Sequence, residues 1–276
     1  YGTLRDLVLG VTIVLADGSI ARSGGHVVKN VAGYDLAKLM SGSLGAYGLL
    51  TEVVLRLHPV PAATGTLAVP AGPDQAFHLA GTLLASPLEP VAVDWHAGRL
   101  LVRLEGTPAS VTQRLERAAR LAETATASVA VLTGDAETAT WQAVADSTTG
   151  VDGDTVLRAG TVPSRFPALV RTLDELTSRH EVGHEVTSSL GVGVHTVRLT
   201  GGTPDAHAAV VAAWRDHVEA AGGSATLHRR IPGLDALVPS WGRPPTSVGL
   251  LRALKDRLDE HHRLAPGRFA PWIEDS

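Results

Sequence analysis

The sequence predicts an α+β fold built from two regions that differ in texture. The first region, up to Pro61, is dense in glycine and in apolar runs of strand length, and prolines at 59 and 61 interrupt regular structure at its end. The second region shows the order β-α-β-β-α-β twice, which is the split βαβ pattern. We therefore expect one domain at residues 1–61 and a second at residues 62–276.

The first region predicts three strands and one short helix. Residues 7–15 are almost wholly apolar, which is typical of a buried strand. Asp17-Gly18 predicts a hairpin turn, because glycine accepts positive φ without steric cost. The expected return strand, helix and third strand lie at residues 19–23, 35–40 and 49–57.

The second region alternates apolar strand candidates with amphipathic helix candidates. The first copy has strands at 65–69, 91–95, 100–104 and 128–132, with helices at 73–85 and 110–125. The second copy has strands at 155–159, 185–188, 192–199 and 224–228, with helices at 164–179 and 204–221. Two more helices are expected, at 136–146 and 248–262. Thr203 as a cap and Pro204 at the first helical position give the clearest helix start.

Composition excludes several classes of protein. The formal charge is −4, from 24 Lys+Arg and 28 Asp+Glu, so no basic stripe for nucleic acid is expected. The sequence contains no run of about 18 apolar residues, so no membrane span is expected. The chain has no cysteine, so it cannot supply disulfides, thiol catalysis or cysteine ligands for an Fe–S cluster. We expect a reducing, cytoplasmic setting, with membrane association only through partners.

Glycines at 42, 45 and 48 form the most informative local motif. Glycine at a three-residue spacing lets backbone N–H groups approach a ligand closely, and such amide concavities bind anions. The order of elements differs from the strand–GxGxxG–helix arrangement of a Rossmann fingerprint. A tight turn between two elements is the alternative interpretation of the same spacing.

Longer stretches around these glycines resemble a known family. The segments GGHVVKNVAGYD (24–35) and GSLGAYGLLTEV (42–53), with YGTLRD at the start, resemble the second half of the FAD-binding domain of vanillyl-alcohol-oxidase (PCMH-type) flavoproteins. The first 60 residues are most similar to the FAD-binding subunits of glycolate oxidases. A weaker similarity extends to the C-terminal segment, where Ala265 stands in place of the usual Asn.

The resemblance implies the fold in more detail. It implies the C-terminal half of a PCMH-type FAD-binding domain, followed by an α+β cap domain with ferredoxin-like βαββαβ units. It also implies that the chain starts midway through the flavin site, because the family carries its main diphosphate loop further upstream. We therefore expect residues 1–276 alone to bind FAD weakly or not at all.

The resemblance further implies which residues lie near FAD. Backbone groups of Gly2 and Thr3 would lie near the diphosphate or ribityl chain, and Leu49 and Leu50 near the adenosine. Asp6 and Asp35 would brace loops of the flavin domain. Gly33, Gly42 and Gly45 would allow close approach of the backbone to FAD. Tyr34, between Gly33 and Asp35 in the sequence, is the last candidate. For Asp6 a turn role, and for Asp35 a place in the first turn of a helix, are equally supported alternatives.

The implied function is FAD-dependent oxidation of glycolate or a similar 2-hydroxy acid. In this interpretation the chain is one subunit of a complex with a second flavoprotein subunit and an Fe–S subunit, to which electrons pass. A single-chain dehydrogenase of the D-lactate type and a non-catalytic assembly subunit remain alternatives. No residue matches a specific catalytic motif, so the catalytic residues stay unknown.

Two further motifs have a structural explanation that is favoured over the functional one. His180-Glu181-Val182-Gly183-His184 spells the HExxH zinc motif, but the helix pattern ends at Arg179, so no metal site is predicted. Arg229 and Arg230 are expected to form an exposed pair, with contact to an acidic substrate as the alternative.

Overall fold

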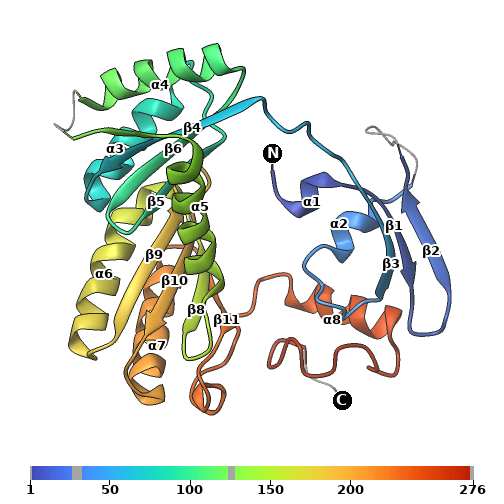
Figure 1. The fold of residues 1–276 in the computed structure, drawn as a ribbon. Coiled ribbons are helices and arrows are strands. Elements are labelled where there is room, and N and C mark those ends of the chain that lie inside the picture. Colours follow the sequence, from blue (N-terminus) through green and yellow to red (C-terminus); the bar gives the residue numbers. More distant parts are fainter. Residues whose placement is uncertain (1, 27–32, 124–127, 274–276) are drawn as a thin grey trace. The chain divides into compact units, whose positions relative to one another are not determined.

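The computed structural model describes residues 2–26, 33–123 and 128–273, which form two compact units. The first unit comprises residues 1–60 and 244–276, and the second comprises residues 61–243. Figure 1 gives the course of the chain through both units. None of the helices in these described ranges has the length and apolar character needed to cross a membrane.

The first unit contains a three-stranded antiparallel sheet in the order β2-β1-β3. Its elements are α1 (Leu4–Leu7), β1 (Val8–Val14), β2 (Ile20–Gly24), α2 (Leu36–Met40), β3 (Leu49–Leu55) and α8 (Val248–Leu258). The strands and the helix α2 confirm the sequence prediction for this region. Residues 27–32, which include the whole KNVA segment of the resemblance, lie outside the described residues.

A small core holds this unit together. Val11, Ile13, Met40 and Tyr47 are buried in it, and Leu254 on α8 packs against it. Strand β3 is exposed along most of its length although it is largely apolar. Apolar side chains on an edge strand are a surface suited to pairing with a further strand.

The C-terminal segment corrects the predicted domain boundaries. The sequence predicts that all of 62–276 belongs to the second domain, whereas residues 244–276 pack with the first sixty residues. The hydroxyl of Tyr47 donates to the carbonyl oxygen of Leu251 at 3.3 Å, and Nζ of Lys255 donates to that of Ala46 at 3.2 Å. An amphipathic pattern predicts that a helix buries one face, but it does not say against which surface.

The second unit is one eight-stranded antiparallel sheet with five main helices in the described residues. The strands are β4 (Ala63–Pro70), β5 (Ala92–His96), β6 (Arg99–Gly106), β7 (Ala130–Leu132), β8 (Thr155–Gly160), β9 (Gly183–Ser189), β10 (Val194–Thr200) and β11 (Ser224–Arg229). The helices are α3 (Pro73–Leu84), α4 (Pro108–Glu123), α5 (Gly134–Thr149), α6 (Phe166–Arg179) and α7 (Pro204–Ala220). Short 3₁₀ turns occur at Pro163–Arg165 and Leu234–Ala236.

The strand order confirms the predicted duplication. The sheet runs β11-β8-β10-β9-β5-β6-β4-β7. Within each half the sequential strands are arranged 4-1-3-2, which is the ferredoxin-like order, and the two halves meet in opposite directions at β9 and β5. The second strand of the later half, for which the sequence signal is weak, is a full strand here because it pairs on both sides.

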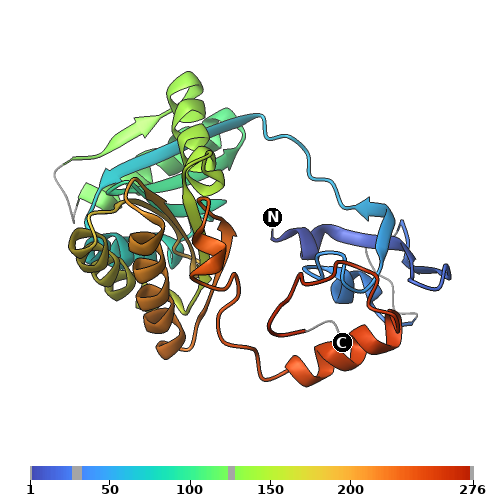
Figure 2. The ribbon, with the colours of Figure 1, turned by 90° about the horizontal axis from the view of Figure 1, so that it is seen from below.

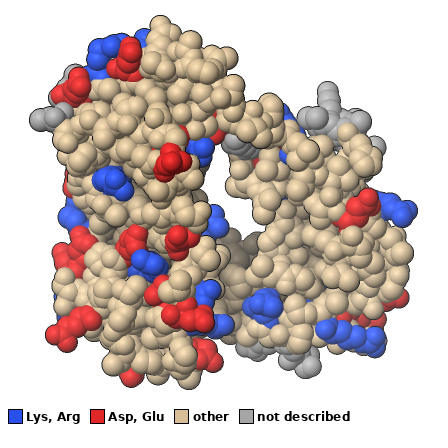
Figure 3. Space-filling model, viewed as in Figure 1, with Lys and Arg blue, Asp and Glu red and all other residues tan. Residues whose placement is uncertain are grey.

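The two faces of this sheet differ in chemistry. One face carries the main apolar core, to which α3, α4, α6 and α7 contribute buried side chains. Helix α5 lies on the other face, where Val144 and Trp141 pack on Ala68 and Leu101. Figure 2 shows α5 across the sheet from α6 and α7. Figure 3 shows acidic and basic side chains interspersed over the viewed surface of this unit.

Aromatic side chains join the two halves of the core. The rings of Trp95 and Phe166, from opposite halves, meet edge to face with centroids 5.4 Å apart. The indole N–H of Trp95 donates to the carbonyl oxygen of Ala71 at 2.8 Å, and that of Trp214 donates to Leu169 at 3.1 Å. Each buried indole therefore has its one donor satisfied while its ring fills the core.

We expect Trp214→Ala to lower the free energy of unfolding of this unit by about 3–5 kcal/mol, because it empties a large, fully packed site. Urea denaturation measures the change. Leu237→Ala is the control, since Leu237 is 48% exposed and should change stability little. An equal loss in both variants would contradict the placement of Trp214 in the core.

Candidate functional site

The glycine turn between α2 and β3 is the first part of the candidate site. Gly42 and Gly45 have φ of +83° and +84°, a conformation that other L residues adopt only with strain. A Cβ at Gly42 would meet nothing within 4 Å, and at Gly45 it would meet only Cβ of Ala265 at 3.9 Å. The turn is therefore open at both glycines, and its backbone is accessible there.

Gly48 has a different role from the two glycines before it. A Cβ at this position would lie 2.7 Å from Cγ2 of Ile13 and 3.2 Å from the carbonyl oxygen of Val14. Gly48 thus allows the turn to pack tightly on β1. Of the three glycines at regular spacing, one serves packing and two leave the backbone open.

Asp6 braces the segment before β1. Its carboxylate accepts hydrogen bonds from the backbone N–H of Thr3 at 2.8 Å and from the Thr3 hydroxyl at 2.7 Å. These hydrogen bonds lower the pKa of Asp6. Gly2 precedes them with φ of +88°. The carboxylate is used within the loop, which agrees with a bracing role and leaves the cofactor role of Gly2 and Thr3 a prediction.

Asp35 is the N-cap of α2. It accepts from the backbone N–H of Lys38 at 3.1 Å and forms an ion pair with the Lys38 ammonium at 2.9 Å. Gly33 has φ of +78° and open space around it, and the Tyr34 side chain is 91% exposed. The contacts of Asp35 are therefore those of a residue at a helix start, which was the alternative to a role beside the cofactor. Gly33 and Tyr34 are accessible.

Leu49 and Leu50 open β3 directly after the turn. They are 62% and 42% exposed, which is unusual for consecutive leucines in a strand. Leu44, within the turn, is 53% exposed and has φ of +49°. The predicted cofactor residues of the turn and of β3 are thus brought together as an open backbone beside exposed apolar side chains.

A buried ion pair holds the turn from the other end of the sequence. Lys255 and Asp259, one helical turn apart at the end of α8, are 2% and 0% exposed in their side chains. Nζ of Lys255 donates to Oδ2 of Asp259 at 2.6 Å and to the carbonyl oxygens of Leu264 at 2.6 Å and Ala46 at 3.2 Å. The sequence does not predict this buried pair, because Lys and Asp at a spacing of four are the usual pattern of an exposed helix face.

Asp259 also orders the chain after α8. Its carboxylate accepts from the backbone N–H groups of Arg263 at 3.0 Å and Leu264 at 2.7 Å. Burial by itself raises the pKa of Asp259, but the hydrogen bonds from Lys255, Leu264 and Arg263 outweigh it and lower the pKa to about 2. The carboxylate is therefore ionised at neutral pH and pairs with the Lys255 ammonium.

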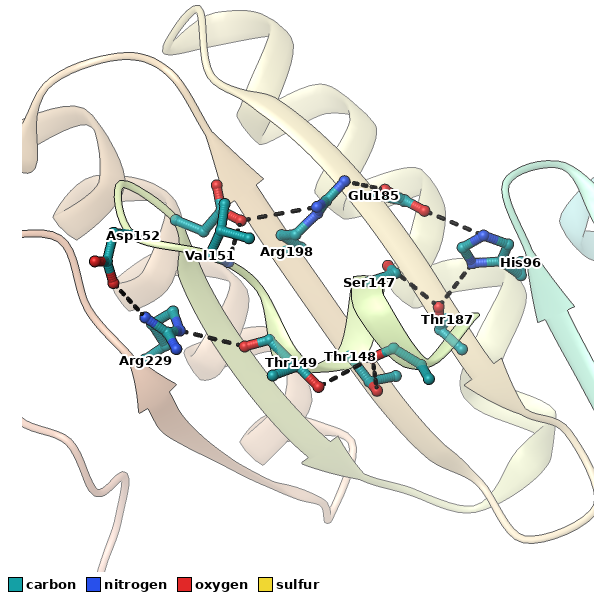
Figure 4. A network of polar contacts seen from close by, with 12 residues as sticks. His96, Ser147, Thr148, Thr149, Val151, Asp152, Glu185, Thr187, Arg198 and Arg229 are labelled. Atoms are coloured by element: carbon teal, nitrogen blue, oxygen red, sulfur yellow. Dashed lines mark hydrogen bonds and ion pairs between the residues drawn. The ribbon is translucent and has the colours of Figure 1, made fainter. Parts of the chain in front are cut away.

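In the second unit, the sheet face under α5 carries a polar network (Figure 4). Nε2 of His96 lies 3.2 Å from Oε1 of Glu185, and the other carboxylate oxygen of Glu185 accepts from Arg198. Nδ1 of His96 lies 2.9 Å from the hydroxyl of Thr187. Burial lowers the pKa of His96, although the charge of Glu185 raises it. The groups in this network satisfy one another and leave little capacity for a ligand.

The HExxH sequence does not form a zinc-binding helix. His180 caps the end of α6, and His184 lies in β9. The two ring nitrogens of His184 contact the Thr177 hydroxyl and the Asp174 carboxylate, each at 2.9 Å. Across residues 2–26, 33–123 and 128–273 no group of three or more His, Asp or Glu could hold a metal ion. The helix ends at Arg179, before Gly183, and Gly183 begins β9 instead of acting as the helix stop that the sequence suggested.

The two arginines at the end of β11 also have structural partners. Arg229 donates to the carbonyl oxygen of Thr149 at 3.2 Å and to Asp152 at 3.0 Å, and Arg230 donates to the hydroxyl of Ser240 at 2.7 Å. These contacts favour the structural explanation over contact with an acidic substrate.

Solved structures share this fold across nearly the whole chain. p-Cresol methylhydroxylase with bound substrate matches 97% of this chain and 65% of its own, with a TM-score of 0.66 at 16% identity. The 4-ethylphenol oxidase of Gulosibacter chungangensis matches 95% of this chain and 65% of its own, with a TM-score of 0.62 at 14% identity. The fold is that of the PCMH-type flavoproteins, which confirms the predicted fold class.

Proteins with similar sequences include glycolate oxidase subunits and a D-lactate dehydrogenase. The glycolate oxidase subunit GlcD of Bacillus subtilis is 25% identical over 302 residues, covering 98% of this chain and 64% of that protein. The subunit GlcE of Escherichia coli is 39% identical over 110 residues, covering 40% of this chain and 31% of that protein. The mitochondrial D-lactate dehydrogenase [cytochrome] of Arabidopsis thaliana is 43% identical over 61 residues, 22% of this chain and 11% of that protein. The predicted resemblance is confirmed.

These relatives are longer proteins. The chain spans under two thirds of GlcD and under one third of GlcE. The sequence matches no protein-family model.

We expect Asp259→Asn to destabilise the first unit by about 3–5 kcal/mol at pH 7, because it leaves the Lys255 ammonium buried without its counter-charge. The folded-state pKa of about 2 lies below the ordinary 3.8, so the stabilisation is complete above about pH 5 and is lost as pH falls towards 2. Hydrogen exchange of the amides of residues 46–48 reports the loss locally.

Asp256→Asn is the matched control on the same helix, since the Asp256 side chain is 65% exposed and its ion pair is with His262, at 3.0 Å. The difference between wild type and Asp259→Asn should shrink between pH 4 and pH 2. A difference that does not change with pH would contradict the role given to the carboxylate.

Proposed function

We propose that this chain binds FAD and acts as the FAD-binding subunit of an oxidoreductase that oxidises glycolate or a similar 2-hydroxy acid. The observation that carries the proposal is the turn at residues 42–45, whose two left-handed glycines leave an open backbone beside exposed Leu49 and Leu50. The relatives named glycolate oxidase subunits, D-lactate dehydrogenases and FAD-linked oxidoreductases support the cofactor and the reaction class.

The chemistry of the turn fits FAD. A dinucleotide with a diphosphate is held well by backbone N–H groups, which carry partial positive charge and need no cationic side chain. In the first unit we assign the backbone contacts to Gly2, Thr3, Gly42 and Gly45, with Gly33 and Tyr34 in the adjoining loop. Leu49 and Leu50 offer apolar contact to the adenosine. Asp6 and Asp35 shape the two loops without touching the cofactor.

Bound FAD would supply a two-electron acceptor. Oxidation of a 2-hydroxy acid to the 2-oxo acid releases two electrons and two protons, and the electrons must then leave the flavin. The chain has no cysteine and so cannot ligate an Fe–S cluster through thiolates. We therefore place the next electron carrier on a partner, an Fe–S subunit, beside a second flavoprotein subunit in a cytoplasmic complex that reaches a membrane only through its partners.

A second candidate is a single-chain dehydrogenase of the D-lactate type. The identities of 41–45% over 61–70 residues with D-lactate dehydrogenases favour it. It differs from the first candidate in needing no partner subunit for turnover. The third candidate is an assembly subunit that keeps the fold but does not take part in catalysis. In that case the activity of the complex would survive loss of flavin from this chain.

The test is Gly45→Val in the protein purified together with any associated subunits. The substitution forces a β-branched side chain into φ of +84° and covers the open backbone, so we expect at least a tenfold loss of FAD affinity and of glycolate-dependent dye reduction. Flavin absorbance per chain measures the first effect and the reduction rate the second.

Gly18→Val is the matched control. Gly18 has φ of +85° with nothing within 4 Å of its Cβ position, so it carries the same backbone strain in the β1–β2 hairpin, away from the turn. Retained FAD in Gly18→Val and lost FAD in Gly45→Val supports the proposal. Full activity after FAD is lost from Gly45→Val would refute the catalytic role, and stoichiometric FAD in both variants would refute the binding site.

A further inference from the structure

The ammonium of Lys255 does more than pair with a carboxylate. Its Nζ donates to Oδ2 of Asp259 and to the carbonyl oxygen of Leu264, each at 2.6 Å, and to the carbonyl oxygen of Ala46 at 3.2 Å. An ammonium has three hydrogens, so these three acceptors use all of them. One buried group therefore joins α8, the segment that follows it and the glycine turn at residues 42–48.

One backbone N–H of the glycine turn has no partner among the described residues. The turn closes two hydrogen bonds of its own, from the N–H of Ser43 to Met40 at 3.1 Å and from the N–H of Ala46 to Ser43 at 2.9 Å. Tyr47 is 4% exposed, and nothing in residues 2–26, 33–123 and 128–273 accepts from its N–H. A buried N–H without an acceptor is rare in folded proteins. This N–H therefore marks a place where a bound molecule can supply the acceptor.

Lys255 sets the direction of that N–H through a shared peptide bond. The carbonyl oxygen of Ala46 and the N–H of Tyr47 belong to one planar trans peptide, so they point in opposite directions. Because Lys255 holds the oxygen, the N–H points away from Lys255. Gly42 and Gly45, with φ of +83° and +84° and open space around them, would otherwise let the turn adopt other conformations. The contact with Lys255 removes that freedom.

The same ion pair also fixes the backbone beside Gly45. The carboxylate of Asp259 accepts from the N–H groups of Arg263 at 3.0 Å and Leu264 at 2.7 Å. The next residue, Ala265, has φ of +44°, a conformation that is costly for alanine. Its Cβ lies 3.9 Å from the Cβ position at Gly45. The segment that ends at Ala265 thus borders the open backbone of the turn.

We propose that Lys255 is a positioning residue for FAD, and that cofactor binding and docking of residues 259–265 are coupled through it. With Lys255 in place, the N–H of Tyr47 is directed at an acceptor oxygen of FAD before the cofactor arrives, so less free energy of binding is used to order the turn. The inference rests on the proposed function, because it takes FAD as the molecule that binds at the turn.

The coupling acts in both directions. By thermodynamic linkage, bound FAD stabilises the docked segment at residues 259–265 by as much as the docked segment strengthens FAD binding. FAD therefore dissociates more readily whenever the segment undocks, and the segment undocks more readily whenever FAD is absent.

Two variants of the protein, purified together with any associated subunits, separate this role from plain stabilisation. Asp259→Asn keeps the donor to Ala46 but leaves the Lys255 charge buried without a partner, which is strongly destabilising. Lys255→Met combined with Asp259→Asn removes the donor and leaves no buried charge. Met fills the space of the lysine stem, and the amide oxygen at position 259 still accepts from the N–H groups of Arg263 and Leu264.

We expect these two variants to rank oppositely in stability and in FAD affinity. Urea denaturation should find the double variant more stable than Asp259→Asn. Fluorescence titration of the deflavinated protein with FAD should find the double variant at least about tenfold weaker than wild type, the loss expected for one hydrogen bond, and weaker than Asp259→Asn. Bound FAD should slow hydrogen exchange at the amides of residues 263–265 in wild type and not in the double variant.

Arg257→Met combined with Asp256→Asn is the matched control. It makes the same two chemical changes at exposed positions of α8, directly after Lys255. FAD affinity and the effect of FAD on hydrogen exchange should both match wild type in this control.

FAD affinity that follows stability, so that the double variant binds FAD better than Asp259→Asn, would leave Lys255 a structural role only and overturn the proposal. Wild-type affinity in the double variant, with FAD lost from Gly45→Val, would also overturn it and leave the proposed function intact. Absence of FAD binding by wild type would refute both. Protection of residues 263–265 by FAD in the double variant would contradict the coupling.

Discussion

The pairing of β5 with β9 is the constraint on which the second unit depends. Three residue pairs, Asp94–Ser189, Trp95–Ser188 and His96–Thr187, join two ferredoxin-like halves into one sheet. Without it each half would expose an unpaired edge strand, a surface that proteins normally cover. Because side chains alternate along a strand, this register sends Trp95 into the core and Asp94 and His96 to the other face. A shift of one residue would exchange the two faces.

From this register follows the unequal chemistry of the two faces. On the apolar face Trp95 and Phe166 meet across the junction, so the core is continuous between the halves. On the opposite face α5 covers only part of the sheet, and the charged groups there largely form pairs, such as Arg103 with Glu137 at 3.4 Å. Arg158, which lines a hollow on this face beside these pairs, is exposed to solvent, so its charge is hydrated and needs no carboxylate partner.

Local patterns in the sequence were enough for most elements and for the duplication, because periodicity and turn residues act over a few positions. They were not enough for contacts between distant segments. The junction of β5 and β9, the return of residues 244–276 to the first unit and the hollow at Arg158 all depend on register or on docking. At the glycine turn, spacing predicted an open backbone, yet only the packing on Ile13 separates Gly48 from Gly42 and Gly45. Lys255 was missed because a buried and an exposed i,i+4 pair have the same spacing.

The second unit is inserted between two segments of the first, and this arrangement has a modest energetic cost. Lys255 and Ala46, which form a hydrogen bond, are 209 residues apart in the sequence, and Tyr47 and Leu251 are 204 residues apart. Loop-closure entropy grows only with the logarithm of length, about 0.6 kcal/mol for each doubling. A second unit that folds by itself shortens the effective loop further. The free energy contributed by the buried Lys255–Asp259 pair and by the core around Ile13 therefore has to exceed only this small entropy cost of loop closure. The conformation of the glycine turn therefore depends on a segment that the chain reaches only after the second unit is complete.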